Sequence, residues 1–250
     1  MKGIILQILY ASKRDALFIG TTLLVICLSC LSCFLGSMAL VENQEARIVY
    51  TAGTSRIAVI LGFMIFITFY IKRLFDNHEI EVILSHSISR SKIILGFFAG
   101  FSVILLTLLL PVLLILLLLK TPIIATLIWN LSVYLEGIVV LSFAICCALM
   151  IKSQVISLTS CFLLYLIGRT IGNFVAYIEL SAKLDIMSIF STILKTISIV
   201  IPRLDFFGKT YWLIHNDISI NDFTMFGIQS LIFCCIFLSM AMIDFRKKEF

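Results

Sequence analysis

Six long apolar runs, separated by short polar segments, constrain this chain more than any other feature of its sequence. A helix of roughly 20 apolar residues crosses a bilayer core of about 30 Å. Because each run meets or approaches that length, we expect an all-α polytopic membrane protein with about six transmembrane helices in one domain, residues 1–250. The predicted spans cover about residues 16–40, 56–74, 93–119, 123–151, 154–178 and 224–243.

The composition excludes a water-soluble fold. Hydrophobic residues make up 61% of the chain and charged residues 13%, whereas soluble domains are nearer half and a quarter. Lipid must therefore be the solvent for most of the chain. The 8 cysteines lie within the apolar runs, where we interpret them as small packing residues and not as metal ligands.

Basic residues favour one orientation in the membrane. If the N-terminus is inside, the inner segments carry most of the lysines and arginines, while the short outer segments carry only Arg47, Arg56 and Lys120. Cytoplasmic segments of membrane proteins are enriched in such residues. We therefore expect both termini to be cytoplasmic. The basic residues form no dense stripe, so the net charge of +5 does not indicate a nucleic-acid partner.

Residues 1–14 have the pattern of a short amphipathic helix, with apolar residues in the middle and basic residues at its ends. Such a helix can lie in the inner membrane interface before the first span. The alternative is a simple lead-in to that span, and the sequence leaves both interpretations open.

The segment of residues 179–223 does not form a comfortable span. Its apolar part, residues 186–201, is short, contains Lys195 and ends at Pro202, which stops a helix. Aromatic residues of the kind that favour the membrane interface follow. We expect re-entrant or interfacial helices on the outer side between spans five and six, and a seventh short span is the alternative.

Residues 72–92, between spans two and three, form the longest charged stretch predicted to face the cytoplasm. Asp76 is positioned to cap a short helix, with Glu79 three residues later in a loose capping-box arrangement. One interpretation is a connecting loop with a solvated face. The other is a helix along the membrane surface that docks a cytoplasmic partner.

The same stretch carries a motif. Its residues are Glu79, Glu81, Leu84, Ser85, Ile88, Ser89 and Arg90. This motif resembles the coupling segment of the type-2 permeases of ATP-binding cassette (ABC) transporters, where a pattern like E-x-E-x-x-L-S-x-P-I-S-R precedes the third span. The chain departs from the pattern at Ser87, where that family often has proline. The expected spans, N-terminal interfacial helix, cytoplasmic termini and outer helices also agree with the family.

The resemblance implies the membrane-spanning permease half of an ABC exporter in a bacterial-type cytoplasmic (inner) membrane. It implies a separate ABC ATPase subunit, which would hold ATP and Mg, and a second permease copy in a homodimer or heterodimer, all within the lipid bilayer. A non-transporting membrane scaffold or assembly factor is the alternative. By the same resemblance, the ATPase-coupling residues are Asp76, Glu79, Ile80, Glu81, Ile83, Leu84, Ser85 and Arg90.

No catalytic motif of the chain competes with a transport function. Gly208, Lys209 and Thr210 match the end of a P-loop, but the first glycine of that motif would fall at Arg203. The sequence contains neither H-E-x-x-H nor G-x-S-x-G. We therefore expect no enzyme activity, no cofactor and no metal on this chain.

Two ionisable residues, Glu136 and Arg169, fall inside predicted spans. At about 1.5 Å per residue, Glu136 is expected near the middle of the membrane and Arg169 nearer its outer side. Such groups usually face a partner or a wet cavity. They form an interhelical ion pair (or Arg169 reaches outward), or else one or both lie on the substrate path.

Overall fold

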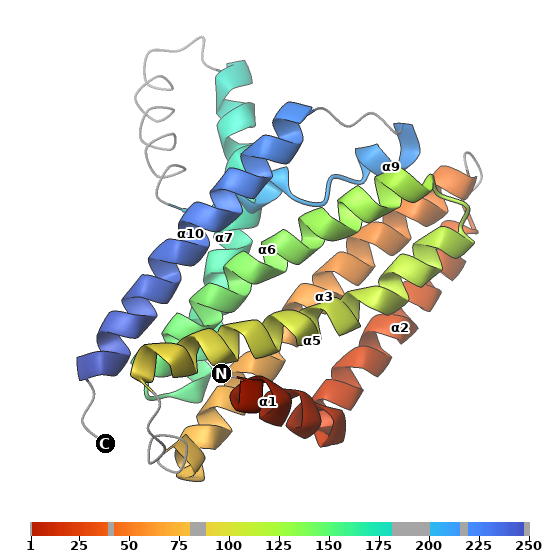
Figure 1. The fold of residues 1–250 in the computed structure, drawn as a ribbon. Helices are drawn as coiled ribbons and strands as arrows, with labels where there is room; N and C mark the ends of the chain where they lie inside the picture. Colours follow the sequence, from red (N-terminus) through yellow and green to blue (C-terminus); the bar gives the residue numbers. More distant parts are fainter. Residues whose placement is uncertain (1, 40–42, 81–88, 182–200, 216–219, 248–250) are drawn as a thin grey trace.

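The computed structural model describes residues 2–39, 43–80, 89–181, 201–215 and 220–247. Regular structure in these residues is entirely helical. The long helices are α1 (Lys2–Arg14), α2 (Ala16–Gly36), α3 (Asn43–Asp76), α5 (Arg90–Leu118), α6 (Ile123–Met150), α7 (Gln154–Ser181) and α10 (Ile220–Lys247) (Figure 1). Two short elements, the 3-10 helix η1 (Leu204–Phe206) and α9 (Tyr211–His215), precede α10.

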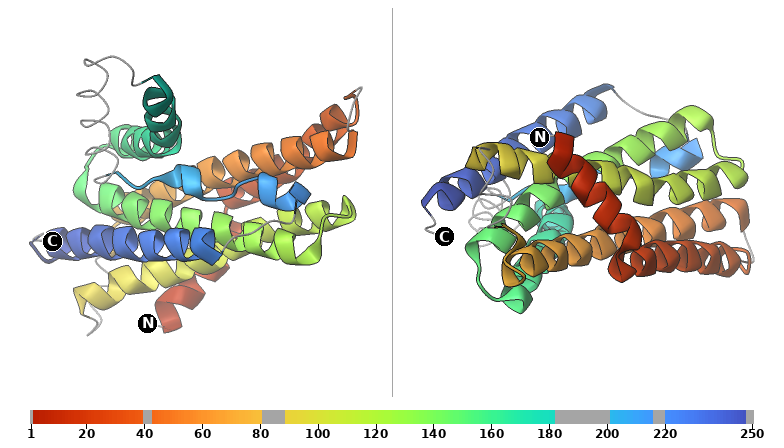
Figure 2. Two further views of the ribbon diagram at one scale, coloured as in Figure 1. Left: turned by 90° about the horizontal axis from the view of Figure 1, so that it is seen from above. Right: turned by 60° about the horizontal axis from the view of Figure 1, so that its bottom comes forward.

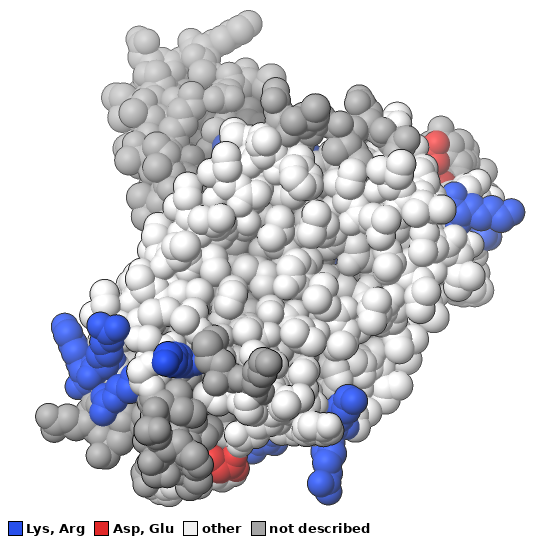
Figure 3. Space-filling view, in the orientation of Figure 1, with Lys and Arg blue, Asp and Glu red and all other residues white. Residues whose placement is uncertain are grey.

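Six of these helices are long and apolar enough to cross a membrane, namely α2, α3, α5, α6, α7 and α10. The prediction of an all-α chain with six such helices is therefore confirmed. Figure 3 shows lysines and arginines near the two ends of the visible face, with a broad uncharged band between them. A surface of this kind suits contact with the hydrocarbon core of a bilayer, where charged side chains are costly.

Helix α3 begins earlier than the sequence indicated. It spans 34 residues from Asn43, whereas the predicted span started at about residue 56. The added turns contain too many polar residues to be recognised by hydrophobicity alone. Their buried side chains are Ile48, Thr51, Ala52 and Ser55. Spacings of three and four residues place these side chains on one helix face. Because α3 already begins at Asn43, Arg56 lies within a helix and not in a connecting segment.

Helices α3 and α6 form the centre of the bundle. In the apolar window of each, 72% of the residues are buried, compared with 17% in α2 and 22% in α10. Helix α2 packs along α3, and α10 packs along α6 (Figure 1). An ionisable residue in the middle of α3 or α6 is therefore removed from both lipid and water, as Arg56 and Glu136 are.

The bundle has two distinct ends. Helix α1 and the last turn of α10 lie at one end, called here the termini end (Figure 1). The start of α3, the α5–α6 turn and α9 lie at the opposite end, called here the distal end (Figure 1). Lys120 makes the tight α5–α6 turn in a left-handed conformation with φ of 59°. The described part of the predicted outer segment, residues 201–215, belongs to the distal end.

Helix α2 contacts the bundle through one narrow stripe. Its buried residues are Val25, Ser29, Ser32 and Gly36. A Cβ atom at Gly36 would lie 2.6 Å from the Cα of Arg47, so the two backbones approach too closely for a larger residue. The rest of α2 exposes leucines and isoleucines, as expected of a helix that faces lipid.

Helix α1 leaves the direction of α2 and lies against α5 (Figure 2). Ile4 and Ile8 are buried there, and they contact Gly96 and Gly100 of α5. Residues four apart lie on one helix face, so each isoleucine fills the gap that one glycine leaves. Asp15 caps α2 by accepting a hydrogen bond from the Leu17 N–H at 3.0 Å, which separates the two helices.

Replacing Gly100 with phenylalanine should release α1 from α5. A Cβ atom there would already lie 2.8 Å from Cδ1 of Ile8, so a ring has no room. We expect the backbone amides of α1 to exchange hydrogen about tenfold faster, because local opening exposes them. Hydrogen–deuterium exchange measures this, and Gly20→Phe is the control because nothing lies within 4 Å of a Cβ there. Unchanged exchange in Gly100→Phe would contradict the packing.

Candidate functional site

A buried ion pair joins the two central helices. Nε of Arg56 on α3 donates a hydrogen bond to Oε2 of Glu136 on α6 at 2.7 Å. The Arg56 side chain is 3% exposed and that of Glu136 is 0% exposed. Oε1 of Glu136 has no partner of hydrogen-bond geometry among the described residues, although Tyr165 is close enough to interact with the carboxylate. Arg56 is therefore the principal partner of this charge.

Two arginines hold residues 201–215, called here the distal connection, against the bundle. Arg56 donates to the carbonyl oxygens of Gly208 at 2.9 Å and Leu204 at 3.2 Å. Arg169 on α7 donates to the carbonyls of Leu204 at 2.7 Å and Phe207 at 3.2 Å. The backbone of residues 204–208 is thus joined to α3 and α7 by four hydrogen bonds from charged donors, which are stronger than neutral ones.

We call the side chains of Arg56, Glu136 and Arg169, with the backbone of residues 204–208, the polar node. It lies in the distal half of the bundle, where α3, α6 and α7 meet the connection. Ser132 of α6 completes it by accepting a hydrogen bond from the Gly208 N–H at 2.9 Å. Elements from four separate parts of the chain therefore depend on one another here.

Glu136 forms an interhelical ion pair with Arg56 and not with Arg169. A pair with Arg169 was one of the alternatives, but Arg56 donates the hydrogen bond to the carboxylate, and no salt bridge joins Glu136 to Arg169 within the described residues. Arg56 was missed because the start of α3 was placed at residue 56. A signal existed in the sequence, since Arg56 follows Ile48 and Ala52 at intervals of four and so continues a buried helix face. Whether Glu136 or Arg169 lies on a substrate path stays a prediction.

Small residues on α7 let the connection approach. A Cβ atom at Gly168 would lie 2.6 Å from the carbonyl oxygen of Pro202. At Gly172 it would lie 1.9 Å from Oδ2 of Asp205. Asp205 in turn accepts a hydrogen bond from Nη2 of Arg203 at 2.9 Å. The two glycines, four residues apart, therefore form the surface of α7 on which the connection docks.

A cavity of about 580 Å³ adjoins the polar node, between α3, α7 and the segment that leads into α9. Three basic side chains line it, from Arg56, Arg169 and Lys209. Tyr165 and Tyr211 are also part of its wall. We call it the cationic cavity, because these three basic side chains line it and no carboxylate is among the described residues of its lining.

A second groove continues from this cavity toward the termini end. Its volume is about 270 Å³, and it shares Leu61 and Phe162 with the cationic cavity. The remaining lining comes from Met64 and Ile65 of α3 and from residues 155–159 of α7. We call it the apolar groove. Together, the two spaces follow the junction of α3 and α7 along the outside of the bundle.

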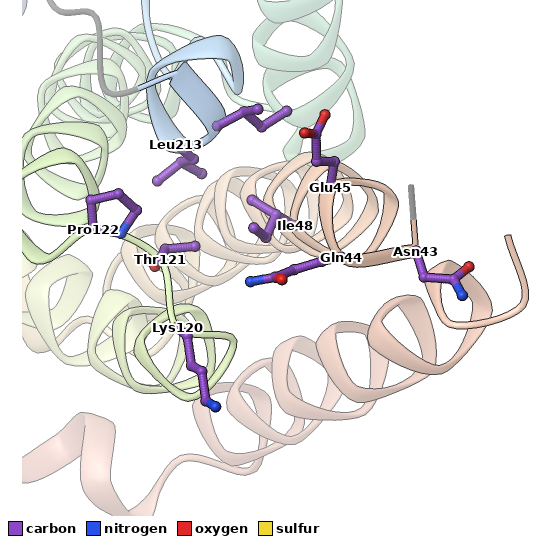
Figure 4. A pocket seen from close by; sticks show the side chains of 9 residues that line it. Asn43, Gln44, Glu45, Ile48, Lys120, Thr121, Pro122 and Leu213 are labelled. Atoms are coloured by element: carbon purple, nitrogen blue, oxygen red, sulfur yellow. The ribbon is translucent and has the colours of Figure 1, made fainter. Parts of the chain in front are cut away.

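A third pocket, of about 480 Å³, opens at the distal end between the start of α3, the α5–α6 turn and α9. Figure 4 shows Glu45 and Lys120 on opposite sides of it, with Ile48 and Thr121 between them. The Thr121 hydroxyl already bonds the Leu116 carbonyl and the Thr126 hydroxyl. Its polar groups do not converge on a common point, so this pocket is a weaker candidate for a binding site.

The predicted coupling residues lie at the termini end as far as the structure describes them. Asp76 is the last residue of α3, and the turn residues Asn77 and His78 separate it from the helical residues that follow, so it is not positioned as their cap. His78 follows in a left-handed conformation with φ of 57°, and helical residues resume at Glu79 and Ile80. Glu81, Ile83, Leu84 and Ser85 lie outside the described residues.

Arg90, predicted as a coupling residue, joins two helices of the bundle. Its Nη1 donates to the carbonyl oxygens of Phe245 at 3.2 Å and Arg246 at 3.1 Å, at the end of α10. Arg246 returns a hydrogen bond to Ser91 Oγ at 3.1 Å. A cation at the C-terminal end of a helix is favourable. The start of α5 and the end of α10 are therefore linked directly.

Further contacts at the termini end attach α3 to its neighbours. Arg73 forms an ion pair with Asp15, which lies between α1 and α2. Lys72 donates to the carbonyl oxygen of Ile151, at the end of α6. The last turn of α3 is therefore joined to both the N-terminal helices and the α6–α7 turn.

Metal-ligating residue types and the P-loop-like tripeptide can be located in the described part of the chain. No group of three or more histidine, cysteine, aspartate or glutamate residues could hold a metal ion in this part of the chain. Gly208, Lys209 and Thr210 lie between η1 and α9, and the described residues before them show no strand of the kind that precedes the loop in a P-loop. Neither a protein-family model nor a curated protein matches the chain.

Proposed function

We propose that the chain is the membrane-spanning permease subunit of an ABC exporter, working with a separate ATPase subunit and a second permease copy. The observation that carries this proposal is the motif from Glu79 to Arg90, which lies between two of the six described helices that are long and apolar enough to span a membrane. In this proposal the termini end faces the cytoplasm, ATP and Mg are held by the partner, and the chain itself is not an enzyme.

The described contacts support a route by which movement of the coupling segment would reach the bundle. The segment connects the end of α3 to the start of α5, and Arg90 ties that start to α10. Helix α3 is continuous from Asp76 back to Arg56, a separation of about 30 Å at 1.5 Å per residue. A tilt of α3 at the termini end would therefore displace the polar node, which holds the distal connection.

The acidic residues of the motif provide the test. If Glu79 and Glu81 contact basic groups on an ATPase, changing both to lysine should lower association at least about tenfold, because like charges then face each other. The tagged chain is purified from its native membranes, and ATP hydrolysis by the eluate is measured. Glu45→Lys is the matched control, since Glu45 is an exposed carboxylate at the distal end.

The outcomes separate the two candidate functions. Loss of ATP hydrolysis from the eluate in the double variant, with retention in Glu45→Lys, supports docking through the motif. The proposal is contradicted if the eluate never hydrolyses ATP. It is also contradicted if the double variant at Glu79 and Glu81 hydrolyses as much ATP as the wild type. Either result would favour a membrane scaffold or assembly factor without transport of its own.

A further inference from the structure

The cationic cavity and the apolar groove form one continuous surface with two chemistries. The cavity presents Arg56, Arg169 and Lys209, and the groove that follows it is lined almost entirely by hydrocarbon side chains. Leu61 and Phe162 belong to both. A small anion would use only the first part, and an uncharged hydrocarbon only the second. A molecule with an anionic head and an apolar chain matches both.

One guanidinium of the cavity, that of Arg169, has no salt bridge within the described residues. Glu136 pairs with Arg56 at 2.7 Å, and Asp205 pairs with Arg203 at 2.9 Å. Arg169 donates from Nη1 to two neutral carbonyls. Lys209 also lines the cavity, with Nζ 5.8 Å from the ring centre of Trp212. An anion entering the cavity would therefore meet at least one guanidinium without a paired carboxylate.

The surface opens sideways to the surroundings of the bundle. Ile57 is 50% exposed, Leu166 is 41% exposed and Phe162 is 40% exposed at the mouth of the cavity. Ile65 and Val155 along the groove are 37% and 72% exposed. In a membrane-spanning bundle, side chains at these positions face lipid. A lipid can thus enter from the side without crossing the bundle core.

The depth of the basic residues suits a lipid headgroup. Arg56 lies 16 residues before Lys72 on α3, a rise of about 24 Å at 1.5 Å per residue. If Lys72 marks one face of a hydrocarbon core about 30 Å thick, Arg56 lies close to the opposite face. Tyr211, further along in the cavity wall, is a residue type that favours this interface.

We propose that the cationic cavity and the apolar groove bind one anionic membrane lipid, with its headgroup at Arg169 and Lys209 and an acyl chain between α3 and α7. The proposal does not depend on the ABC exporter function, because it needs neither an ATPase nor transport. The lipid would fasten α7 and the distal connection to α3 from the outside, next to the polar node.

Native mass spectrometry of the purified chain tests this by counting retained lipids. We expect phosphatidylglycerol to be retained about tenfold more tightly than phosphatidylcholine, and Lys209→Gln to lower that preference about fivefold. Lys120→Gln is the matched control, since it removes one exposed positive charge at the same end of the bundle. It should leave the preference unchanged.

A second pair of variants tests the chain-binding part. Ile65→Trp fills the apolar groove and should lower phosphatidylglycerol retention about fivefold without changing any charge. Ile26→Trp on α2 is the control, because Ile26 has 39% exposure against 37% for Ile65 and lines neither space. The thermal midpoint of each variant in detergent confirms that loss of lipid is not loss of fold.

Three results would overturn the proposal. Equal retention of phosphatidylglycerol and phosphatidylcholine would show that the cavity does not select an anionic headgroup. Full competition by inorganic phosphate, together with no effect of Ile65→Trp, makes the cavity a site for free anions. A dimer mass that disappears in Ile65→Trp while lipid retention stays the same makes a second copy of the chain the occupant of the groove. All of these readouts use the chain alone, so they stand whether or not an ATPase binds.

Discussion

Replacing Glu136 with alanine should destabilise the protein by about 3–5 kcal/mol, because it leaves the charge of Arg56 buried without its partner. The Arg56 side chain is only 3% exposed, so water compensates little of its charge once the carboxylate is removed. Its two hydrogen bonds to the connection would remain, but neutral carbonyls do not compensate a buried guanidinium. The thermal midpoint in detergent measures the loss, and hydrogen exchange in residues 204–208 shows whether the connection is released.

The control for this change is Glu45→Ala, which removes an exposed carboxylate from the same end of the bundle. It should change stability by less than about 0.5 kcal/mol. A Glu136→Ala midpoint equal to that of Glu45→Ala would contradict the importance of the pair.

A double variant separates the charge from the hydrogen bonds. In Arg56→Met with Glu136→Leu, no charge is left unpaired, and replacing a buried ion pair by apolar residues is often neutral. The Gly208 carbonyl nevertheless loses its donor, which costs about 1–3 kcal/mol if the group stays buried. We therefore expect the double variant to be more stable than Glu136→Ala and less stable than the wild type. A double variant less stable than Glu136→Ala would contradict the view that the unpaired charge costs more than the lost hydrogen bonds.

The helices could be predicted from hydrophobicity because lipid imposes a simple length rule on apolar runs. All six predicted spans correspond to helices, and the error at α3 arose where the chain remains helical beyond its apolar run. Residues such as Asn43 and Glu45 end the apolar signal but not the helix. Hydrophobicity therefore indicates which residues can lie within the lipid core, whereas the ends of a helix depend on packing and capping.

The polar node could be predicted only in part. Glu136 and Arg169 were recognisable because ionisable groups inside apolar runs need partners. Their actual partners, Arg56 and the carbonyls of Leu204 and Phe207, lie far away in sequence. Which residue meets which is decided by how α3, α6 and α7 pack, and a single sequence does not contain that information.

The role of Arg90 illustrates the same limit. Its place in a motif predicted contact with another subunit, yet its Nη1 also binds the last turn of α10. The two roles are compatible, because one guanidinium offers five N–H donors. A residue at the edge of a coupling segment can therefore take part in the bundle that the segment is proposed to move.

Gly208→Ala, which adds one methyl group to the distal connection, should lower the free energy of unfolding by about 2–4 kcal/mol. Two causes combine. Gly208 has φ of +54°, a left-handed conformation that costs other residues about 1–2 kcal/mol. A Cβ atom there would also lie 2.8 Å from Nη1 of Arg56, so the guanidinium must shift from the Glu136 carboxylate.

Gly53→Ala is the matched control because it adds the same methyl group on the other side of the cationic cavity. Gly53 lies inside α3, and a Cβ atom there has nothing within 4 Å. Alanine should therefore stabilise the protein by about 0.5–1 kcal/mol through its higher helix propensity. The two glycine substitutions thus have opposite expected signs, measured as thermal midpoints in the same detergent. If both raise the midpoint, the docking of residue 208 on Arg56 cannot be an important contribution to stability, and the polar node would reduce to the Arg56–Glu136 pair.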